Sequence, residues 1–318
     1  MSGFSREFNT LSTADDVIAG IDMTGKTALI TGASTGLGAE AARVMAVAGA
    51  KVIMAVRNRE KAELVRASIV SEQPEAQLTI VELELGDLDS VRRCADTVLA
   101  EHDSLDVLLA NAGIMACGKG ETAQGHEMQF GTNHLGHFLL TCLLVPALKK
   151  AAPSRAVVLS SAAHKYGDVD LADPDYRNQD YDKWMAYGRS KTANAQFSAE
   201  LNRRLVSYGI TANAVHPGMV MTELGRNLEQ SDFELLGDMA KQSGTQFKTP
   251  AQGAATEVWA ATAPELEGKG GLYLEDCTIG VLAKEGNTGG YQAYALDLEA
   301  ASRLWSVSEK LVGQVFEF

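Results

Sequence analysis

The sequence has few cysteines and lacks a long apolar run. Its 318 residues include four scattered cysteines, Cys94, Cys117, Cys142 and Cys277, without a CxxC pair. This pattern argues against a disulfide framework and a zinc motif. The most apolar helical stretch, residues 138–148, is too short to span a bilayer, and the N-terminus has no basic segment followed by an apolar run. We therefore expect a cytoplasmic protein without a membrane partner.

Basic residues are scarce as well. The chain has 28 Lys and Arg against 41 Asp and Glu, which gives a formal net charge of −13. Polyanions are repelled on average by such a charge, so nucleic acid is not an expected partner. A hydrophobic content of 46% is that of an ordinary globular chain with a sizeable core.

Short apolar segments alternate with helical patterns along most of the chain. The expected strands cover residues 27–30, 51–55, 78–83, 106–110, 156–160 and 211–215, and the expected helices cover 37–48, 60–70, 90–101, 128–150 and 187–207. This alternation predicts an α/β fold, a Rossmann-like doubly wound parallel sheet with helices on both faces. After residue 215 the pattern loosens, before a helix at 250–261, a strand at 271–274 and a C-terminal helix at 296–312.

A glycine-rich loop, TGASTGLG at 31–38, follows the first expected strand and leads into a helix. Gly32 can form the tight turn, Gly36 removes a side chain that would block a pyrophosphate, and Gly38 lets the helix pack close to the strand. The helix N-terminus supplies free N–H groups. This placement favours a dinucleotide cradle over a glycine-rich turn without a ligand.

The GxxxGxG spacing resembles the short-chain dehydrogenase/reductase family. Further matches follow in family order: Asp87-Leu88, Asn111-Ala112-Gly113, Asn133 within GTNHLGHF, Ser161, YGRSK at 187–191 and HPG at 216–218. The resemblance covers about residues 25–275. It implies an NAD(P)-dependent oxidoreductase that interconverts an alcohol and a ketone or aldehyde by direct hydride transfer. It also implies a homo-oligomer.

This resemblance sets the expected domains and cofactor contacts. Residues 1–24 form an N-terminal arm, in which Thr13 and Asp16 cap a short helix. Residues 25–275 form the dinucleotide-binding and catalytic domain. Residues 276–318 form a C-terminal extension that packs near the substrate edge. Asp87 and Leu88 would contact adenine, and Asn111 would stabilise the sheet beside the cofactor. Val220 and Thr222 would hold the nicotinamide amide. The other expected contacts are Ser34, Thr35, Leu37, Ala112, Gly113, Tyr187, Lys191, Pro217 and Gly218.

Cofactor choice is expected to depend on the end of the second strand. There Val56-Arg57-Asn58-Arg59 carries no acid to accept the ribose hydroxyls of NAD. Arg57 can clamp a 2′-phosphate, with Ser34 adding a hydroxyl, so NADP(H) is favoured. The alternative is that Arg57 and Arg59 are solvent-facing charges and that NAD(H) is also accepted.

The expected reaction centre consists of Tyr187, Lys191, Ser161 and Asn133. Tyr187 and Lys191 are four residues apart and share a helix face, so the ammonium can stabilise the phenolate and assist proton transfer. Ser161 would hydrogen-bond the substrate oxygen; Ser160 competes for this role, but the resemblance aligns the second serine of the pair. Asn133 resembles the family asparagine whose backbone holds a water linking lysine to solvent.

No metal is expected. His134 and His137 lie three residues apart without a nearby carboxylate, a spacing that is more often structural than ligating.

The sequence departs from the usual family pattern beside the reaction centre. Twenty-five residues separate Ser161 from Tyr187, and they include the acidic and aromatic stretch 168–184. Longer spacings of this kind resemble retinol-dehydrogenase-like and protochlorophyllide-reductase-like members, which implies a bulky apolar carbonyl or, in the second case, a ring double bond. We expect 168–184 and 219–239 to form the substrate wall; the alternative is that both are solvated surface excursions.

Other functions are weighed against this one. A dinucleotide-sensing regulator without catalysis typically lacks the tyrosine and lysine that are present here, and a sugar-nucleotide epimerase or dehydratase would have a different glycine spacing. A reductase of a carbon–carbon double bond stays open as an alternative.

Overall fold

A computed structural model describes residues 7–284 and 289–318. In this part of the chain, the central sheet has eight strands in the order β3-β2-β1-β4-β5-β6-β7-β8. Neighbouring strands are parallel except for β8, which pairs antiparallel with β7. The predicted α/β fold with a doubly wound sheet is therefore confirmed. The strands are β1 (Thr27–Thr31), β2 (Lys51–Val56), β3 (Gln77–Glu82), β4 (Val107–Ala110), β5 (Ser154–Leu159), β6 (Ile210–His216), β7 (Tyr273–Glu275) and β8 (Thr278–Ile279).

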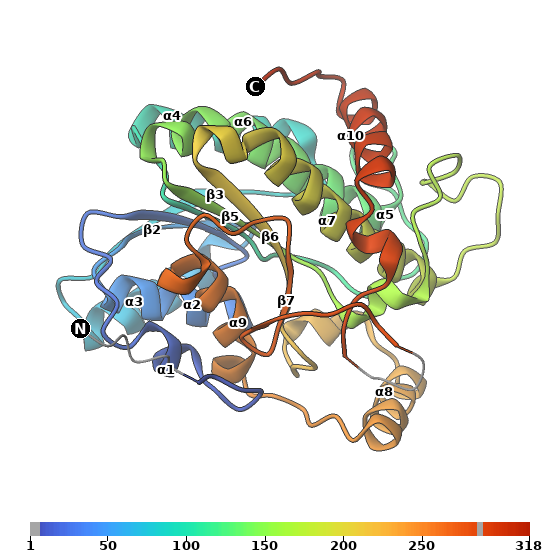
Figure 1. Cartoon of the computed structure of the whole chain (residues 1–318), viewed down its shortest axis with the longest axis horizontal. Coiled ribbons are helices and arrows are strands. Elements are labelled where there is room, and N and C mark those ends of the chain that lie inside the picture. The colour runs from blue at the N-terminus through green and yellow to red at the C-terminus, as the bar shows by residue number, and fades with distance from the viewer. Residues whose placement is uncertain (1–6, 285–288) are drawn as a thin grey trace.

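Helices cover both faces of this sheet (Figure 1). One face carries α4 (Leu88–Glu101), α6 (Gly136–Ala151), α7 (Lys183–Leu205) and, outside α7, α10 (Leu298–Val312); the other carries α1 (Ala14–Ile18), α2 (Gly36–Val47), α3 (Arg59–Glu72) and α9 (Pro250–Thr262). The central strands are apolar on both sides, as buried parallel strands are, so each face has its own core. Before α6 lie α5 (Met128–Phe130) and a π-helical turn, η1 (Gly131–Leu135).

Both ends of the described chain pack on the domain. The expected capping box at Thr13 and Asp16 is present and begins α1, which lies against α9. The C-terminal helix α10 lies alongside α7 (Figure 1). Its Trp305 is buried. Among the described helices, none combines the length and apolar character needed to cross a membrane.

The helices near the substrate edge differ most from expectation. Helix α7 begins at Lys183 rather than at Tyr187, because Asp182 caps it by accepting a hydrogen bond from Met185 N at 2.6 Å. A helix that the loose pattern did not predict, α8 (Gln230–Ser243), lies apart from both helical layers (Figure 1). The remaining short turns are η2 (Ala162–Tyr166), η3 (Val206–Tyr208), η4 (Glu223–Asn227), η5 (Pro264–Leu266) and η6 (Ala293–Leu296).

Candidate active site

A cavity of about 1210 Å³ opens at the carboxyl ends of the parallel strands. This is the edge where ligands bind in open α/β sheets. Most of the residues expected to contact cofactor or substrate line it: Gly32, Ser34, Thr35, Gly36, Leu37, Arg57, Asn111, Ala112, Gly113, Ser161, Tyr187, Lys191, Pro217, Gly218, Val220 and Thr222.

The glycine-rich loop has a bare backbone that leaves room for a dinucleotide. Gly32 and Gly36 have φ of +71° and +57°, the left-handed region that glycine adopts without strain. Gly38 does not line the cavity: a Cβ there would lie 2.7 Å from Gly32 O, so it permits the close helix–strand packing expected of it. Together with the size of the cavity and the start of α2 at its wall, these features fit a dinucleotide phosphate group.

Beneath the loop, a buried polar chain connects Thr31 to Asn133. Thr31 Oγ1 accepts hydrogen bonds from the backbone N–H groups of Asn111 and Ala112, both at 2.9 Å. The same hydroxyl lies 2.9 Å from His137 Nε2, and His137 Nδ1 lies 2.9 Å from Asn133 O. Since burial lowers the pKa of His137 to about 4, its ring is neutral at pH 7 and donates through Nδ1 to the carbonyl.

Asn133 stands behind the cavity wall rather than on it. Its side chain accepts a hydrogen bond from Ile114 N at 2.9 Å and donates one to Ser190 Oγ at 2.9 Å. The Asn133 carbonyl oxygen, which the resemblance assigns to a water, has a second lone pair beyond the one that His137 occupies. The π-helical turn at 131–135 gives this segment its irregular backbone.

Tyr187 and Lys191 lie side by side on α7, and each is only 4% exposed. The Lys191 ammonium lies 5.8 Å from the centre of the Tyr187 ring and donates to Leu159 O at 3.1 Å. Burial raises the pKa of Tyr187 to about 12, against a hydrogen bond with Ser161 that lowers it. Burial lowers the pKa of Lys191 to about 8. At pH 7 the pair is therefore a phenol beside an ammonium.

The two neighbouring serines have different surroundings. Both serines line the cavity, but Ser160 is buried and donates to Lys191 O at 2.8 Å, whereas Ser161 is partly exposed and hydrogen-bonds Tyr187. His164, in η2, contacts the backbone of Ser161: its Nδ1 lies 2.6 Å from Ser161 O. The backbone N–H of Gln292, in the C-terminal extension, donates to His164 Nε2 at 3.1 Å. Ser161 is thus better placed than Ser160 to meet a substrate.

The expected adenine contact needs a correction. Asp87 and Leu88 do not line the cavity; Glu84 and Leu85, three residues earlier, do. The physical reason is that Asp87 caps α4 by accepting from Asp89 N at 3.0 Å, while Leu88 is buried in the core. Glu84 also faces Arg57, whose guanidinium is 3.4 Å from its carboxylate and whose side chain is 67% exposed.

The two helical histidines have separate partners. His134 Nε2 lies 2.7 Å from Ser308 Oγ on α10, whereas His137 joins the chain to Thr31. Within residues 7–284 and 289–318, no group of three or more His, Cys, Asp or Glu side chains is arranged to hold a metal ion.

Of the two segments expected to form the substrate wall, one lines the cavity and the other largely does not. Apolar residues of the α8 region line the cavity: Met219, Met221, Leu224, Leu228, Phe233, Leu236 and Met239. Of residues 168–184, only Trp184 does so. Part of this stretch packs on residues 117–129 instead: Glu127 N donates to Asp175 at 3.0 Å, and Tyr181 Oη donates to Glu127 at 3.0 Å.

The roles of several residues around the site follow only from the fold. Thr31 opens the glycine-rich loop and His137 lies in GTNHLGHF, but no local pattern indicates the contact between them. Lys248 carries no local sequence signal. Asp232, which joins α8 to α7, could have been suspected from the capping box that it forms with Glu229. His164 ends the segment SSAAH, which begins with the serine pair at 160–161.

Comparison with known proteins agrees with this geometry. The sequence profile of the short chain dehydrogenase family matches residues 26–232. Human retinol dehydrogenase 14 is 42% identical over 309 residues, covering 92% of this chain and 87% of that protein.

Solved structures show the same relationship. An uncharacterized protein from Mycobacterium paratuberculosis superposes with a TM-score of 0.74 at 36% identity, covering 97% of this chain and 100% of that one. A short chain dehydrogenase from Burkholderia cenocepacia, solved in complex with NADP, gives a TM-score of 0.65 at 26% identity and covers 80% and 96%. The chain therefore belongs to the short-chain dehydrogenase/reductase family of NAD(P)-dependent oxidoreductases, in its retinol-dehydrogenase-like branch.

Proposed function

We propose that this protein is a cytoplasmic enzyme that interconverts an alcohol and a carbonyl on a bulky apolar substrate, with NADP(H) as the favoured dinucleotide and NAD(H) as the other candidate. The observation that carries the proposal is the convergence of Ser161, Tyr187 and Lys191 on one cavity that also contains the glycine-rich loop. When bound, the dinucleotide supplies or accepts the hydride.

The chain's own residues move the proton and hold the oxygen. In carbonyl reduction, Tyr187 Oη gives its proton to the substrate oxygen, while the Ser161 hydroxyl donates a hydrogen bond to the same oxygen. The Lys191 ammonium, still charged at pH 7, stabilises the phenolate that forms. In this proposal the backbone carbonyl of Asn133 holds a water that links Lys191 to solvent, and the proton is returned through this water.

The apolar character of the wall supports the substrate class. Leucine, methionine and phenylalanine side chains of the α8 region face the cavity, and thioethers adapt to irregular apolar ligands. A retinoid aldehyde is therefore the first compound to test, because the human relative is named for retinol.

A spectrophotometric screen with NADPH and NADH tests the proposal. We expect dinucleotide oxidation with bulky apolar aldehydes or ketones, little with small polar carbonyls, and an alcohol product by mass spectrometry. A saturated carbonyl product would identify a carbon–carbon double-bond reductase. Dinucleotide binding without turnover of any carbonyl or alcohol would favour the sensing alternative.

A further inference from the structure

Residues 219–248 form a segment that carries η4 and α8, and its two ends meet at Lys248. The chain leaves the sheet edge after Gly218, forms η4 and α8, and returns at Lys248, whose backbone N–H donates to Met219 O at 2.8 Å. Val220 and Lys248 also form an isolated parallel bridge. The start and the end of this segment therefore meet at the loop proposed to hold the nicotinamide.

The Lys248 side chain lies flush against that loop. Gly218 has φ +91°, and a Cβ there would lie 2.9 Å from both Cδ and Cε of Lys248 and 3.2 Å from Nζ. Because Gly218 has no side chain, the lysine stem fits along the loop backbone. The Lys248 side chain is only 7% exposed, so its charge needs a close partner.

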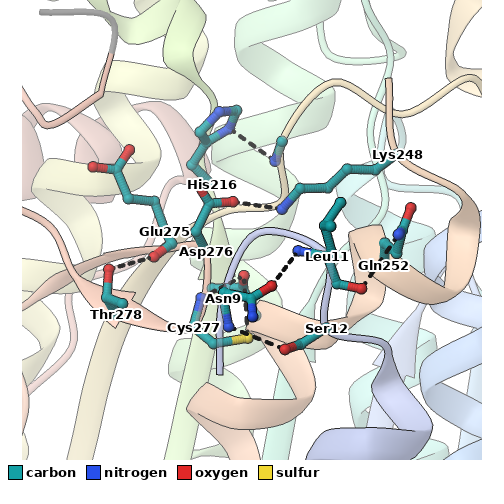
Figure 2. A network of polar contacts seen from close by, with 12 residues as sticks. Asn9, Leu11, Ser12, His216, Lys248, Gln252, Glu275, Asp276, Cys277 and Thr278 are labelled. Atoms are coloured by element: carbon teal, nitrogen blue, oxygen red, sulfur yellow. Dashed lines mark hydrogen bonds and ion pairs between the residues drawn. The ribbon is translucent and has the colours of Figure 1, made fainter. Parts of the chain in front are cut away.

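Asp276 supplies that partner from the turn between β7 and β8. Its Oδ1 lies 2.5 Å from Lys248 Nζ (Figure 2). Asp276 and Cys277 have φ of +49° and +54°, a conformation that side-chain-bearing residues rarely adopt. Cys277 N donates to Thr256 Oγ1 on α9 at 3.2 Å, which fixes the turn. The turn therefore holds the Asp276 carboxylate beside the Lys248 ammonium.

His216 contacts the same loop. Its Nδ1 accepts hydrogen bonds from Gly218 N at 3.4 Å and from Ala162 N at 3.3 Å. Burial lowers the pKa of His216 to about 3, so the ring is neutral at pH 7, and the two N–H donors make Nδ1 its unprotonated nitrogen. The loop is consequently held by a neutral ring as well as by the charged pair.

We infer that Lys248 and Asp276 form a positioning pair for the nicotinamide half of the bound dinucleotide. The ion pair holds Gly218 and the paired ends of the α8 segment, Met219 and Lys248, against the β7–β8 turn. Val220 and Thr222 therefore keep their positions at the cavity wall. The inference rests on the proposed function, because it takes this loop to be the nicotinamide-binding one. Neither residue is proposed to touch the reacting atoms.

Binding of a whole dinucleotide and of its adenine half tests this inference. Lys248→Met keeps most of the stem against Gly218 and removes the charge; Asp276→Asn keeps the size of the side chain. We expect each variant to raise the Kd of NADPH by about tenfold, since a small misplacement of positioning groups has large effects. The Kd of adenosine 2′,5′-bisphosphate should stay within about twofold. If wild type prefers NAD(H), NADH replaces NADPH and ADP replaces the bisphosphate in these measurements.

Two further variants complete the experiment. In the double variant the effects should be less than additive, since either change breaks the same pair. Lys26→Met is the matched control, because Lys26 pairs with Asp106 at 2.9 Å before β1 and β4, at the opposite edge of the sheet. We expect both of its dissociation constants to be unchanged.

The outcomes separate the two proposals. Unchanged NADPH affinity in Asp276→Asn, or equal losses for NADPH and the bisphosphate, would overturn the positioning role and leave the proposed function standing. A wild-type protein that binds neither dinucleotide would overturn both. If Lys248→Met does not fold, Asp276→Asn decides alone, since the Asp276 side chain is 47% exposed.

Discussion

Tyr187 and Lys191 show how one environment shifts two neighbouring groups in opposite directions. Burial disfavours the charged form of each, so it raises the pKa of the phenol and lowers that of the ammonium. At neutral pH both groups carry their protons, which is the state that reduction of a carbonyl requires. Oxidation of an alcohol would first need loss of the phenolic proton.

The pH dependence of carbonyl reduction follows from these shifts. The pKa of Lys191 is about 8, below the ordinary lysine value, so its charge is lost as pH rises through about 8. We expect kcat/KM for reduction, at saturating NADPH, to be level near pH 7 and to fall above pH 8, because the neutral amine no longer stabilises the phenolate. A level profile up to pH 10 would contradict this.

Removal of the Tyr187 hydroxyl should abolish most turnover. Tyr187→Phe is expected to lower kcat by about 10²- to 10⁴-fold, the usual contribution of general acid–base catalysis, while the Kd of NADPH stays nearly unchanged. Tyr166→Phe is the control, since its ring also lines the cavity but its hydroxyl contacts Met239. Steady-state kinetics and fluorescence titration of both variants test this. Near-normal turnover in Tyr187→Phe would remove Tyr187 from the mechanism.

Arg57 is expected to decide between the two dinucleotides. Its exposed guanidinium stands at the cavity wall, where it can bind a 2′-phosphate bidentately, although Glu84 competes for it at 3.4 Å. Arg57→Asp should lower the ratio of kcat/KM with NADP to that with NAD by about tenfold or more. Arg59→Asp, which changes a charge paired with Glu63 on α3, is the control. Equal kcat/KM of wild type with NADP and with NAD, or an unchanged ratio in Arg57→Asp, would mean that Arg57 does not bind the 2′-phosphate.

Among the elements, α8 depends on Asp232 for its attachment to the catalytic helix. The Asp232 carboxylate accepts hydrogen bonds from Lys183 Nζ at 2.6 Å, Trp184 Nε1 at 3.1 Å and Glu229 N at 2.9 Å. Lys183 and Trp184 form the first turn of α7, shortly before Tyr187. This one side chain therefore joins α8, which carries part of the proposed substrate wall, to the helix that carries Tyr187.

Loss of that attachment should weaken substrate binding more than cofactor binding. We expect Asp232→Ala to raise KM for bulky apolar substrates by several-fold, because the Trp184 and Glu229 N–H donors lose their acceptor and α8 is held less firmly, with little change in the Kd of NADPH. Asp238→Ala, on an exposed part of α8 where Asp238 pairs with Lys241, is the control. The proposed role of Asp232 fails if the two variants have the same KM.

The elements also show what the sequence could and could not predict. Apolar alternation predicted the main strands and crossover helices, because the central strands β1, β4, β5 and β6 are buried on both faces. The segment ELELGDLDS offers two acid–leucine pairs, and only the fold shows that Glu84-Leu85 faces the cavity while Asp87 caps α4. The contact of Thr31 with His137 spans 106 positions of the chain, so no local pattern indicates it.

In the whole molecule, the two terminal extensions cover the outer helices of the domain. Helix α1 lies on α9, and α10 lies on α7, on opposite sides of the sheet. The homo-oligomer that the family resemblance implies would have to form through surfaces other than these covered faces. Light scattering of the purified chain measures whether it does.

The C-terminal helix should stabilise the domain without taking part in the reaction. Trp305 is 1% exposed, and its ring packs edge-on against Phe138 of α6 at 4.9 Å, with the Arg204 guanidinium 4.3 Å from its centre. Trp305→Ala is expected to lower the free energy of unfolding by about 3–5 kcal/mol, the cost of a large cavity in a packed core. Val315→Ala, at a side chain that is 71% exposed, should change it by less than about 0.5 kcal/mol. Denaturant unfolding measures both. Because Trp305 packs outside α7 and not at the cavity, kcat of the folded Trp305→Ala protein should match wild type; a loss of kcat in that protein would mean that α10 also positions Tyr187.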